Sequence, residues 1–230
     1  MMSLTYAGSF YTCAKKGSKN KEKTYHILSN LRRRLDLMRE NSKYAGRLFA
    51  YNSYEKKYGF DLSQMKGFKI GNCAEYSKAT LAALCANGYY NSSRAGLLYE
   101  IKFINKKTKK VEYREFEDLD HNFVITDLNK RKKKDIVIDS WLGFADYECG
   151  AFAKFRQIYD DELDTYEEMH KKLFRVEKMK SGEEFNPEDY EMRTGFQFRD
   201  SEYLATPSDK EKLGKLVAQK HPGLLLDVNA

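Results

Sequence analysis

The chain has 230 residues, of which 41% are hydrophobic and 33% are charged. A chain of this length buries about 70% of its unfolded surface, so it can fold stably without disulfides or metal ions. Lys and Arg (41) exceed Asp and Glu (34), giving a formal net charge of +7. The basic residues are spread along the sequence and form no stripe with aromatic residues, so we do not expect nucleic acid as the partner.

The cysteines and the N-terminus indicate the compartment. Cys13, Cys73, Cys85 and Cys149 stand at irregular spacing without a Cys-x-x-Cys pair, which favours free thiols in a reducing environment. The N-terminus has no uninterrupted apolar run, and no later stretch could span a bilayer. We therefore expect a protein that is cytoplasmic as synthesised. Secretion into a host cell without a signal peptide would leave no recognisable feature in the sequence.

The first third of the chain predicts a flexible segment and two helices. Residues 1–20 become rich in Ser, Gly and Lys, and we expect them to be flexible. Over 21–44, apolar residues recur at steps of three and four, which predicts an amphipathic helix. A weaker helical pattern runs over 48–58 and would end at Gly59.

The next segment, 73–86, is apolar almost all round. A helix of this composition is buried rather than surface-lying. Asn87-Gly88 supplies the left-handed residue that commonly ends a helix. The sequence therefore predicts a central buried helix with Cys73 in its first turn.

The middle of the chain alternates polar and apolar residues, which predicts an antiparallel sheet because the connections are short enough for hairpins. Helical patterns return after it, and 181–206 is the least structured segment by pattern. The tail has a capping box at Ser208–Glu211. The expected strands are 99–103, 111–116, 120–126 and 135–141, and the expected helices are 152–159, 163–179 and a tail helix ahead of Pro222-Gly223. The apolar stripe of the 163–179 helix is Leu163, Tyr166, Met169, Leu173 and Val176.

Cys73 is the candidate nucleophile. A free thiol has a pKa near 8.5, and a helix N-terminus favours the thiolate through its unpaired amides and dipole. A nearby imidazolium would favour it further. Cys85, by contrast, lies deep in an apolar helix, where burial raises the pKa of a thiol and leaves it inert.

His121 and Asp139 are the candidate base and its orienting carboxylate. They are an even number of residues apart, so in a hairpin they can share a face. Direct opposition requires a turn centred at Lys130, and a turn centred one residue later makes them diagonal neighbours. We expect their shared face to meet the first turn of the Cys73 helix.

Three short motifs resemble a known group of enzymes. Gly-Asn-Cys73-Ala-Glu75, Asp-His121-Asn-Phe-Val-Ile and Ile-Val-Ile-Asp139-Ser-Trp141 resemble the transglutaminase-like branch of the papain-like cysteine enzymes, over roughly residues 65–145. That branch includes bacterial effector proteases and deamidases with a Cys-His-Asp triad. The resemblance implies an α+β papain-like core, with the Cys-bearing helix on an antiparallel sheet and extra helices at both ends. It also implies that Cys73 is the nucleophile, His121 the base and Asp139 the orienting residue.

The oxyanion and substrate-binding residues are less well defined. Papain-type proteases have a Gln shortly before the Cys, whereas Gln64 here stands nine residues upstream. The backbone amide of Cys73, assisted by Asn72, is the more cautious candidate. Glu75 is either a substrate-orienting carboxylate or a first-turn helix stabiliser, and Trp141 either walls the site or belongs to the core. A resemblance to arylamine N-acetyltransferases is weakened because their Arg-Gly-Gly before the Cys is absent.

These observations predict one catalytic domain over 21–180, with 181–230 as a C-terminal extension packed on it. The expected activity is thiol-dependent acyl transfer on protein amides through a thioester, as in a cysteine protease, deamidase or transglutaminase. A bacterial effector acting on a host protein fits the motifs, and no cofactor or metal is expected. The alternatives are an N-acetyltransferase-like enzyme, a silent papain-like module that binds an anionic partner through Lys130–Lys134, and a metal site built from the triad residues.

Overall fold

The computed structural model describes residues 71–126, 135–200 and 206–225, two short strands between residues 49 and 60, and the single helical positions Arg33 and Leu37. The predicted flexible segment 1–20 and the rest of the predicted helix 21–44 lie outside the described residues. The chain forms two compact units. The first contains residues 1–95, 122–148 and 200–230, and the second contains Gly96–His121 and Cys149–Arg199. The predicted domain boundaries at residues 20 and 180 stay predictions.

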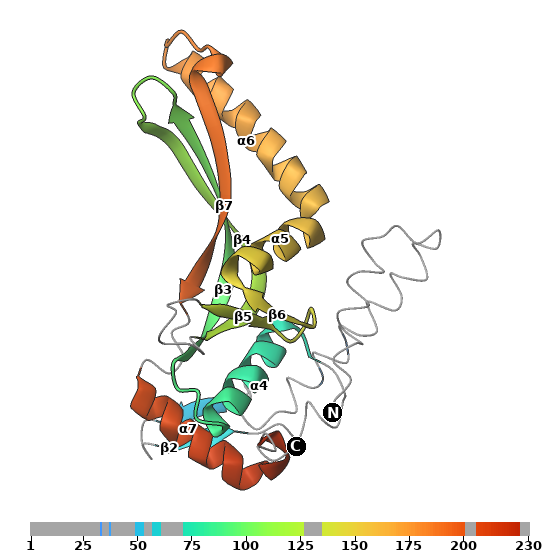
Figure 1. Cartoon of the computed structure of the whole chain (residues 1–230). Coiled ribbons are helices and arrows are strands. Elements are labelled where there is room, and N and C mark those ends of the chain that lie inside the picture. Colours follow the sequence, from blue (N-terminus) through green and yellow to red (C-terminus); the bar gives the residue numbers. More distant parts are fainter. Residues whose placement is uncertain are drawn as a thin grey trace, which may run out of the picture. The chain divides into compact units, whose positions relative to one another are not determined.

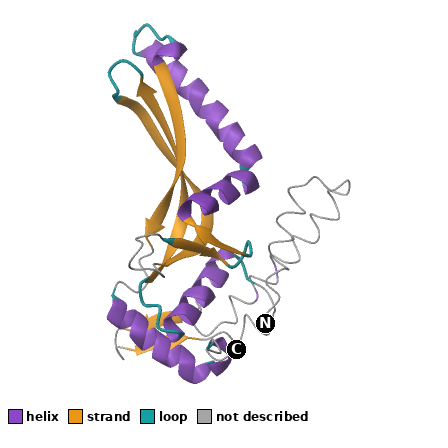
Figure 2. Ribbon diagram, viewed as in Figure 1, coloured by secondary structure: helices purple, strands orange, loops and turns teal. Residues whose placement is uncertain are grey.

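The fold is α+β, and its five-stranded antiparallel sheet has the order β6-β5-β4-β3-β7 (Figures 1 and 2). In the first unit, β5 pairs with both β4 and β6 in antiparallel register. The strands are β3 (Ser92–Asn105), β4 (Val111–Thr126), β5 (Ile136–Asp139), β6 (Phe144–Tyr147) and β7 (Tyr190–Asp200).

The sheet differs from the prediction in β4, in β7 and in β6, a strand that was not expected. The strands expected at 111–116 and 120–126 are one continuous strand, β4, which is irregular at Asp120, where φ is 48°. The Asp120 N–H donates to the Asp118 carboxylate at 3.1 Å. This local hydrogen bond lies where a break between two strands was expected. The segment 181–206, expected to be the least structured, contains the 3-10 turn η1 (Pro187–Asp189) and strand β7.

The helix predicted over 48–58 is also wrong. The chain there forms β1 (Phe49–Asn52) and β2 (Lys57–Phe60), which pair antiparallel with Phe49 opposite Phe60. Gly59 lies inside β2 and does not end a helix. Tyr and Phe recur through this stretch, and aromatic residues favour strands as strongly as they suit one face of a helix.

Helix α4 (Cys73–Ala86) is the centre of the first unit and has the predicted bounds. None of its residues is exposed, and Gly88, with φ of 84°, follows the C-cap Asn87 as expected. It packs against α7 (Pro207–Lys220), and the two helices share a core with β4. That core is Tyr76, Leu81, Ala82, Cys85, Val124, Leu213 and Val217.

The contact between α4 and α7 is close because of a glycine. A Cβ built on Gly214 would lie 2.2 Å from the backbone oxygen of Cys85, which no real side chain tolerates. The N-cap of α7 is Thr206, whose side chain accepts the Asp209 N–H, followed by Pro207. The capping box predicted at Ser208–Glu211 is therefore displaced toward the N-terminus, because Pro suits the first helical position.

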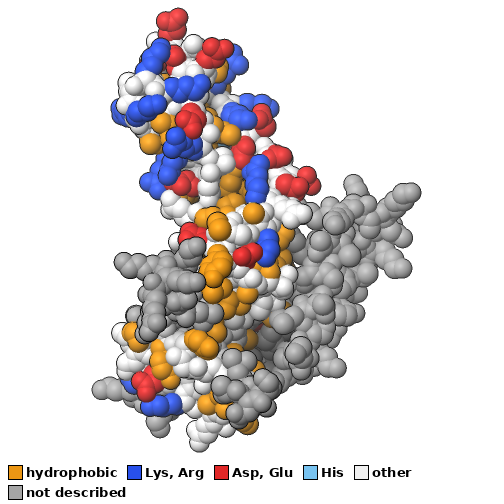
Figure 3. Space-filling view, in the orientation of Figure 1, with side chains coloured by type: hydrophobic (Ala, Val, Ile, Leu, Met, Phe, Trp, Pro, Cys, Tyr) orange, Lys and Arg blue, Asp and Glu red, His pale blue; other side chains and the backbone are white. Residues whose placement is uncertain are grey.

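The second unit is held together by aromatic rings. Helices α5 (Glu148–Ile158) and α6 (Asp160–Lys180) carry Phe155 and Phe174 in its core. Phe174 stacks on Phe103 at a centroid distance of 4.2 Å. On the face shown in Figure 3, hydrophobic side chains are interspersed with charged ones.

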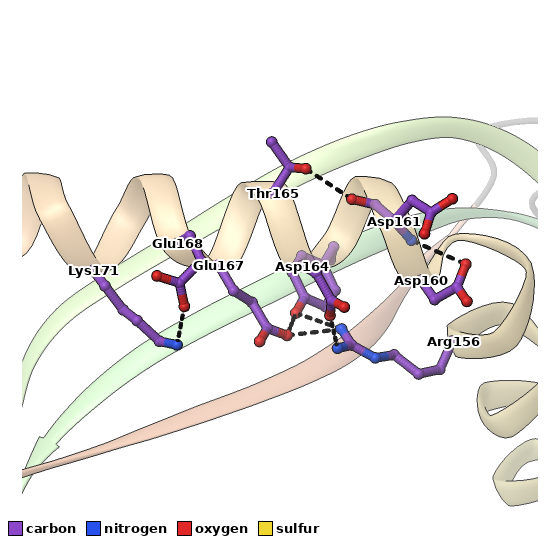
Figure 4. A network of polar contacts seen from close by, with 9 residues as sticks. Arg156, Asp160, Asp161, Asp164, Thr165, Glu167, Glu168 and Lys171 are labelled. Atoms are coloured by element: carbon purple, nitrogen blue, oxygen red, sulfur yellow. Dashed lines mark hydrogen bonds and ion pairs between the residues drawn. The ribbon is translucent and has the colours of Figure 1, made fainter.

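A polar network joins α5 to α6 (Figure 4). The Arg156 guanidinium contacts Asp164 at 2.5 Å and Glu167 at 2.7 Å. The Tyr99 hydroxyl donates to Glu167, and burial together with this carboxylate raises the pKa of Tyr99. These bonds hold the start of α6 against β3.

Three of the five residues in the apolar stripe predicted for α6 face outward. Leu163 is fully buried, but Met169, Leu173 and Val176 are exposed. The inner face instead holds His170, whose Nδ1 lies 2.9 Å from the Tyr113 hydroxyl, and Phe174. Periodicity alone could not separate the two faces, because apolar residues occur on both.

Candidate functional site

Cys73 is the first residue of α4, and the helix start around it is fully capped. The Asn72 side chain accepts the Ala74 N–H at 3.0 Å, and the Glu75 carboxylate accepts the Asn72 N–H at 3.0 Å. This reciprocal pair is a capping box, which fixes the chain where it enters the helix. The Cys73 side chain is therefore held at a helix N-terminus, with 7% of its surface exposed.

A polar pair from the sheet lies beside the thiol. The Asn122 side-chain amide is 3.9 Å from the Cys73 sulfur and can donate to it. The amide oxygen of Asn122 accepts from the Arg94 guanidinium at 2.7 Å. Arg94 thus orients the amide so that its N–H groups point away from the cation and toward the Cys73 sulfur.

Asp139, the predicted orienting carboxylate, ends β5. It is 1% exposed, and its Oδ1 accepts the backbone N–H groups of Trp141 at 3.1 Å and Leu142 at 2.9 Å. The carboxylate therefore stabilises the turn into β6. The next residue, Ser140, connects β5 to α4, since its hydroxyl lies 2.6 Å from that of Thr80.

The register of the hairpin follows the second of the two predicted alternatives. Val124 pairs with Ile138 and Thr126 with Ile136, so the register is centred on Arg131 rather than Lys130. Continued by one residue, it sets Asp139 opposite Phe123. His121 precedes Phe123 by two residues and is on the same side of the strand.

His121 itself is described within the second unit. It is 1% exposed, and its ring packs edge-on against Phe155 at 5.6 Å and near Tyr159 at 6.1 Å. Adjacent strand residues point to opposite faces, so the contact of Asn122 with Cys73 does not by itself bring His121 to the thiol. Cys73 and Asp139 belong to the first unit, and the triad stays a prediction.

The remaining predicted residues have structural surroundings. Glu75 is 1% exposed and completes the capping box, which is the helix-stabilising role weighed for it. Trp141 packs against the core of the first unit. Gln64 and the basic run Lys130–Lys134 lie outside the described residues.

The other described cysteines differ sharply from Cys73. Cys85 is fully buried, and burial raises the pKa of its thiol to about 11, with Lys210 acting in the opposite direction. The burial of Cys85 and its raised pKa agree with the expectation, and its inert character stays a prediction. Cys149 is exposed at the start of α5.

A pocket of about 340 Å³ lies in the second unit, and none of the predicted site residues line it. Its walls are mainly aromatic, with Phe103, Phe174 and Tyr190 among them. In the described part of the chain, no cluster of three or more His, Cys, Asp and Glu side chains could hold a metal ion. No helix among the described residues has the length and apolar character needed to cross a membrane.

Asn122 is the residue that sequence reasoning missed. It follows His121 directly, and a polar amide within the run His-Asn-Phe-Val-Ile is unusual for a strand that continues into a core. That signal was present in the sequence.

Comparison of the chain with protein-family models, with curated proteins and with solved structures found no match.

Proposed function

We propose that the protein is a thiol-dependent acyl-transfer enzyme in which Cys73 is the nucleophile. The observation that carries the proposal is the setting of the Cys73 sulfur, which combines the capped N-terminus of α4 with the Asn122 amide at 3.9 Å. A helix N-terminus and a hydrogen-bond donor both favour the thiolate, which is the reactive form of cysteine.

The proposed reaction proceeds through a thioester. The Cys73 thiolate attacks the carbonyl carbon of a protein amide, and the backbone amide of Cys73, assisted by Asn72, stabilises the oxyanion. The C–N bond then breaks, and the leaving amine or ammonia takes a proton from His121. Water or a second amine attacks the thioester and releases Cys73. In this scheme His121 acts as base and then acid, and Asp139 orients it.

The identity of the leaving group and the acceptor separates three activities. Loss of a peptide amine is proteolysis, loss of ammonia to water is deamidation, and loss of ammonia to a lysine amine is transglutamination. All three begin with the same half-reaction. A host protein as substrate, with the enzyme as a bacterial effector, is the part of the proposal that rests on the motif resemblance alone.

Thiol labelling with iodoacetamide across a range of pH tests the nucleophile. Wild type should show one fast-reacting site below pH 8, identified by peptide mapping as Cys73 and absent from Cys73→Ala. Cys149, which is exposed in the first turn of α5, is the internal comparison for a thiol at a helix start without the Asn122 donor. If Cys73 reacts no faster than Cys149, and only above about pH 8, the proposal fails.

A second variant tests the role of His121. In a Cys–His ion pair, His121→Gln shifts the onset of Cys73 labelling to higher pH. An onset that is unchanged in His121→Gln removes His121 from the mechanism. Intact-mass analysis of candidate substrate proteins then distinguishes cleavage, deamidation and cross-linking.

A further inference from the structure

The outward face of α6 carries four exposed apolar side chains. Met169, Leu173, Val176 and Met179 are 46%, 44%, 45% and 64% exposed. They recur at steps of three and four residues, so they form one stripe along the helix, which we call the α6 stripe. Figure 4 shows Thr165, one turn before Met169, pointing away from the side chains that contact Arg156. The α6 stripe therefore lies on the side of the helix opposite to the Arg156 network.

Opposite charges stand at the two ends of this stripe. Glu162 lies two turns before Met169, and Lys180 lies two turns after Leu173, so both share the face of the α6 stripe. Both side chains are exposed, and neither makes an ion pair within the part of the chain that the structure describes. The whole helix has the same polarity, since its first turn is acidic and its last turn is basic.

We propose that the α6 stripe is a self-association surface that binds α6 of a second copy of the chain in antiparallel orientation. A two-fold axis at the level of Lys171 sets Met169 beside Leu173 of the second copy. The same axis sets Glu162 beside Lys180 of the second copy, and the symmetry makes each contact twice. A parallel pair would instead place like charges together at both ends, which is destabilising.

The charge pattern selects a second copy over other occupants. An antiparallel copy presents basic residues to the acidic half of α6 and acidic residues to its basic half, without a change in sequence. On one flank of the α6 stripe, the same antiparallel arrangement brings Glu168 of each copy near Arg175 of the other copy. The apolar seam is short, so the dimer should be weak and dependent on protein concentration.

Sedimentation velocity of the full-length chain over a range of concentrations tests the proposal. Wild type should convert from monomer to dimer, and Leu173→Asp should remain monomeric. Glu162→Lys and Lys180→Glu should each weaken the dimer at least about tenfold, because each creates two like-charge contacts. The double variant Glu162→Lys/Lys180→Glu should recover the dimerisation constant of the wild type. Helix–dipole effects cannot explain this recovery, since both substitutions are unfavourable to the helix.

Glu184→Lys is the matched control, because it makes the same charge change on an exposed residue outside α6. It should leave the dimerisation constant unchanged. Circular dichroism checks that each variant is folded. A wild type that stays monomeric at all concentrations overturns the proposal, as does a double variant that fails to recover. A monomer whose α6 amides are protected from hydrogen exchange would show that another part of the chain covers the stripe, and would also overturn it.

Discussion

Two cysteines on one helix have opposite chemical surroundings. Cys73 stands at the capped N-terminus of α4 beside the Asn122 amide. Cys85 stands three turns later against α7, where the surroundings are apolar and a negative charge is disfavoured. The sequence alone predicted the raised pKa of Cys85, because it places that thiol deep in an apolar helix. The nucleophilic role of Cys73 stays a proposal.

The raised pKa of Cys85 predicts a pH-dependent contribution to stability. Burial raises it from 9.0 in an ordinary thiol to about 11 in the folded state. The stabilisation is therefore fully present below pH 9 and is lost as the pH rises through about 11. The difference in free energy of unfolding between wild type and Cys85→Ala should fall by about 3 kcal/mol across this window. Urea denaturation at a series of pH values measures it.

Cys149→Ala is the control for this experiment, because Cys149 is exposed. The difference in free energy of unfolding between Cys149→Ala and wild type should not change with pH. Lys210 opposes the trend, since burial lowers its pKa, but it is present in both proteins that are compared. A difference for Cys85→Ala that is flat from pH 8 to pH 11 would contradict the assignment.

Asn122 should control the reactivity of Cys73. Asn122→Ala removes the donor 3.9 Å from the sulfur and leaves the helix cap intact. A hydrogen bond to a charged group is worth about 1.5–3 kcal/mol, so we expect labelling of Cys73 at neutral pH to slow about tenfold or more. A time course of iodoacetamide labelling, with samples quenched at intervals and analysed by peptide mapping, measures the rate. An unchanged rate, with Cys149 as the reference, would show that Asn122 does not act on the thiolate.

At the scale of elements, local rules predicted α4 but failed over 48–58, where the predicted helix is the strand pair β1 and β2, and failed on β7. The bounds of α4 were predictable because its composition and its Asn-Gly end are local signals. Strand β7 was not predicted, although Tyr190, Met192 and Phe196 alternate at strand spacing. The residues that β7 pairs with come from β3, far away in sequence, and such partners are invisible in a local window.

The close approach of α4 and α7 depends on Gly214. Gly214→Ala gains about 1 kcal/mol of helix propensity, but its Cβ would meet the Cys85 backbone at 2.2 Å. Overpacking of a core costs about 1–3 kcal/mol and here falls on backbone that cannot rotate away. We therefore expect a net loss of about 1–2 kcal/mol in the free energy of unfolding, measured by urea denaturation.

Gly223→Ala is the matched control, since a Cβ on Gly223 meets no atom within 4 Å. Its stability should stay within about 0.5 kcal/mol of wild type. If Gly214→Ala proves as stable as this control, the two helices are not packed as closely as described.

At the scale of the whole molecule, strands β3 and β4 contribute residues to both units. Shared strands should couple the two units when the protein unfolds. Phe174→Ala removes a side chain that is 2% exposed in the second unit and should cost about 3–5 kcal/mol. We expect it also to speed labelling of Cys85 in the first unit, measured in sub-denaturing urea.

Val111→Ala removes an apolar side chain that is 45% exposed and serves as the control. It should change neither the urea midpoint nor the labelling rate. If Phe174→Ala unfolds the second unit while Cys85 keeps its wild-type labelling rate, the two units unfold independently.

The packing of α4 against α7 also sets an order of events during synthesis. The sequence of the second unit lies between these helices, so α4 is made long before the helix that completes its core. The hairpin of β3 and β4, by contrast, joins neighbouring segments and can form as soon as both have left the ribosome. Until α7 arrives, the close contact between Gly214 and the backbone of Cys85 cannot form. The core behind the proposed nucleophile is thus among the last parts of the protein to be completed.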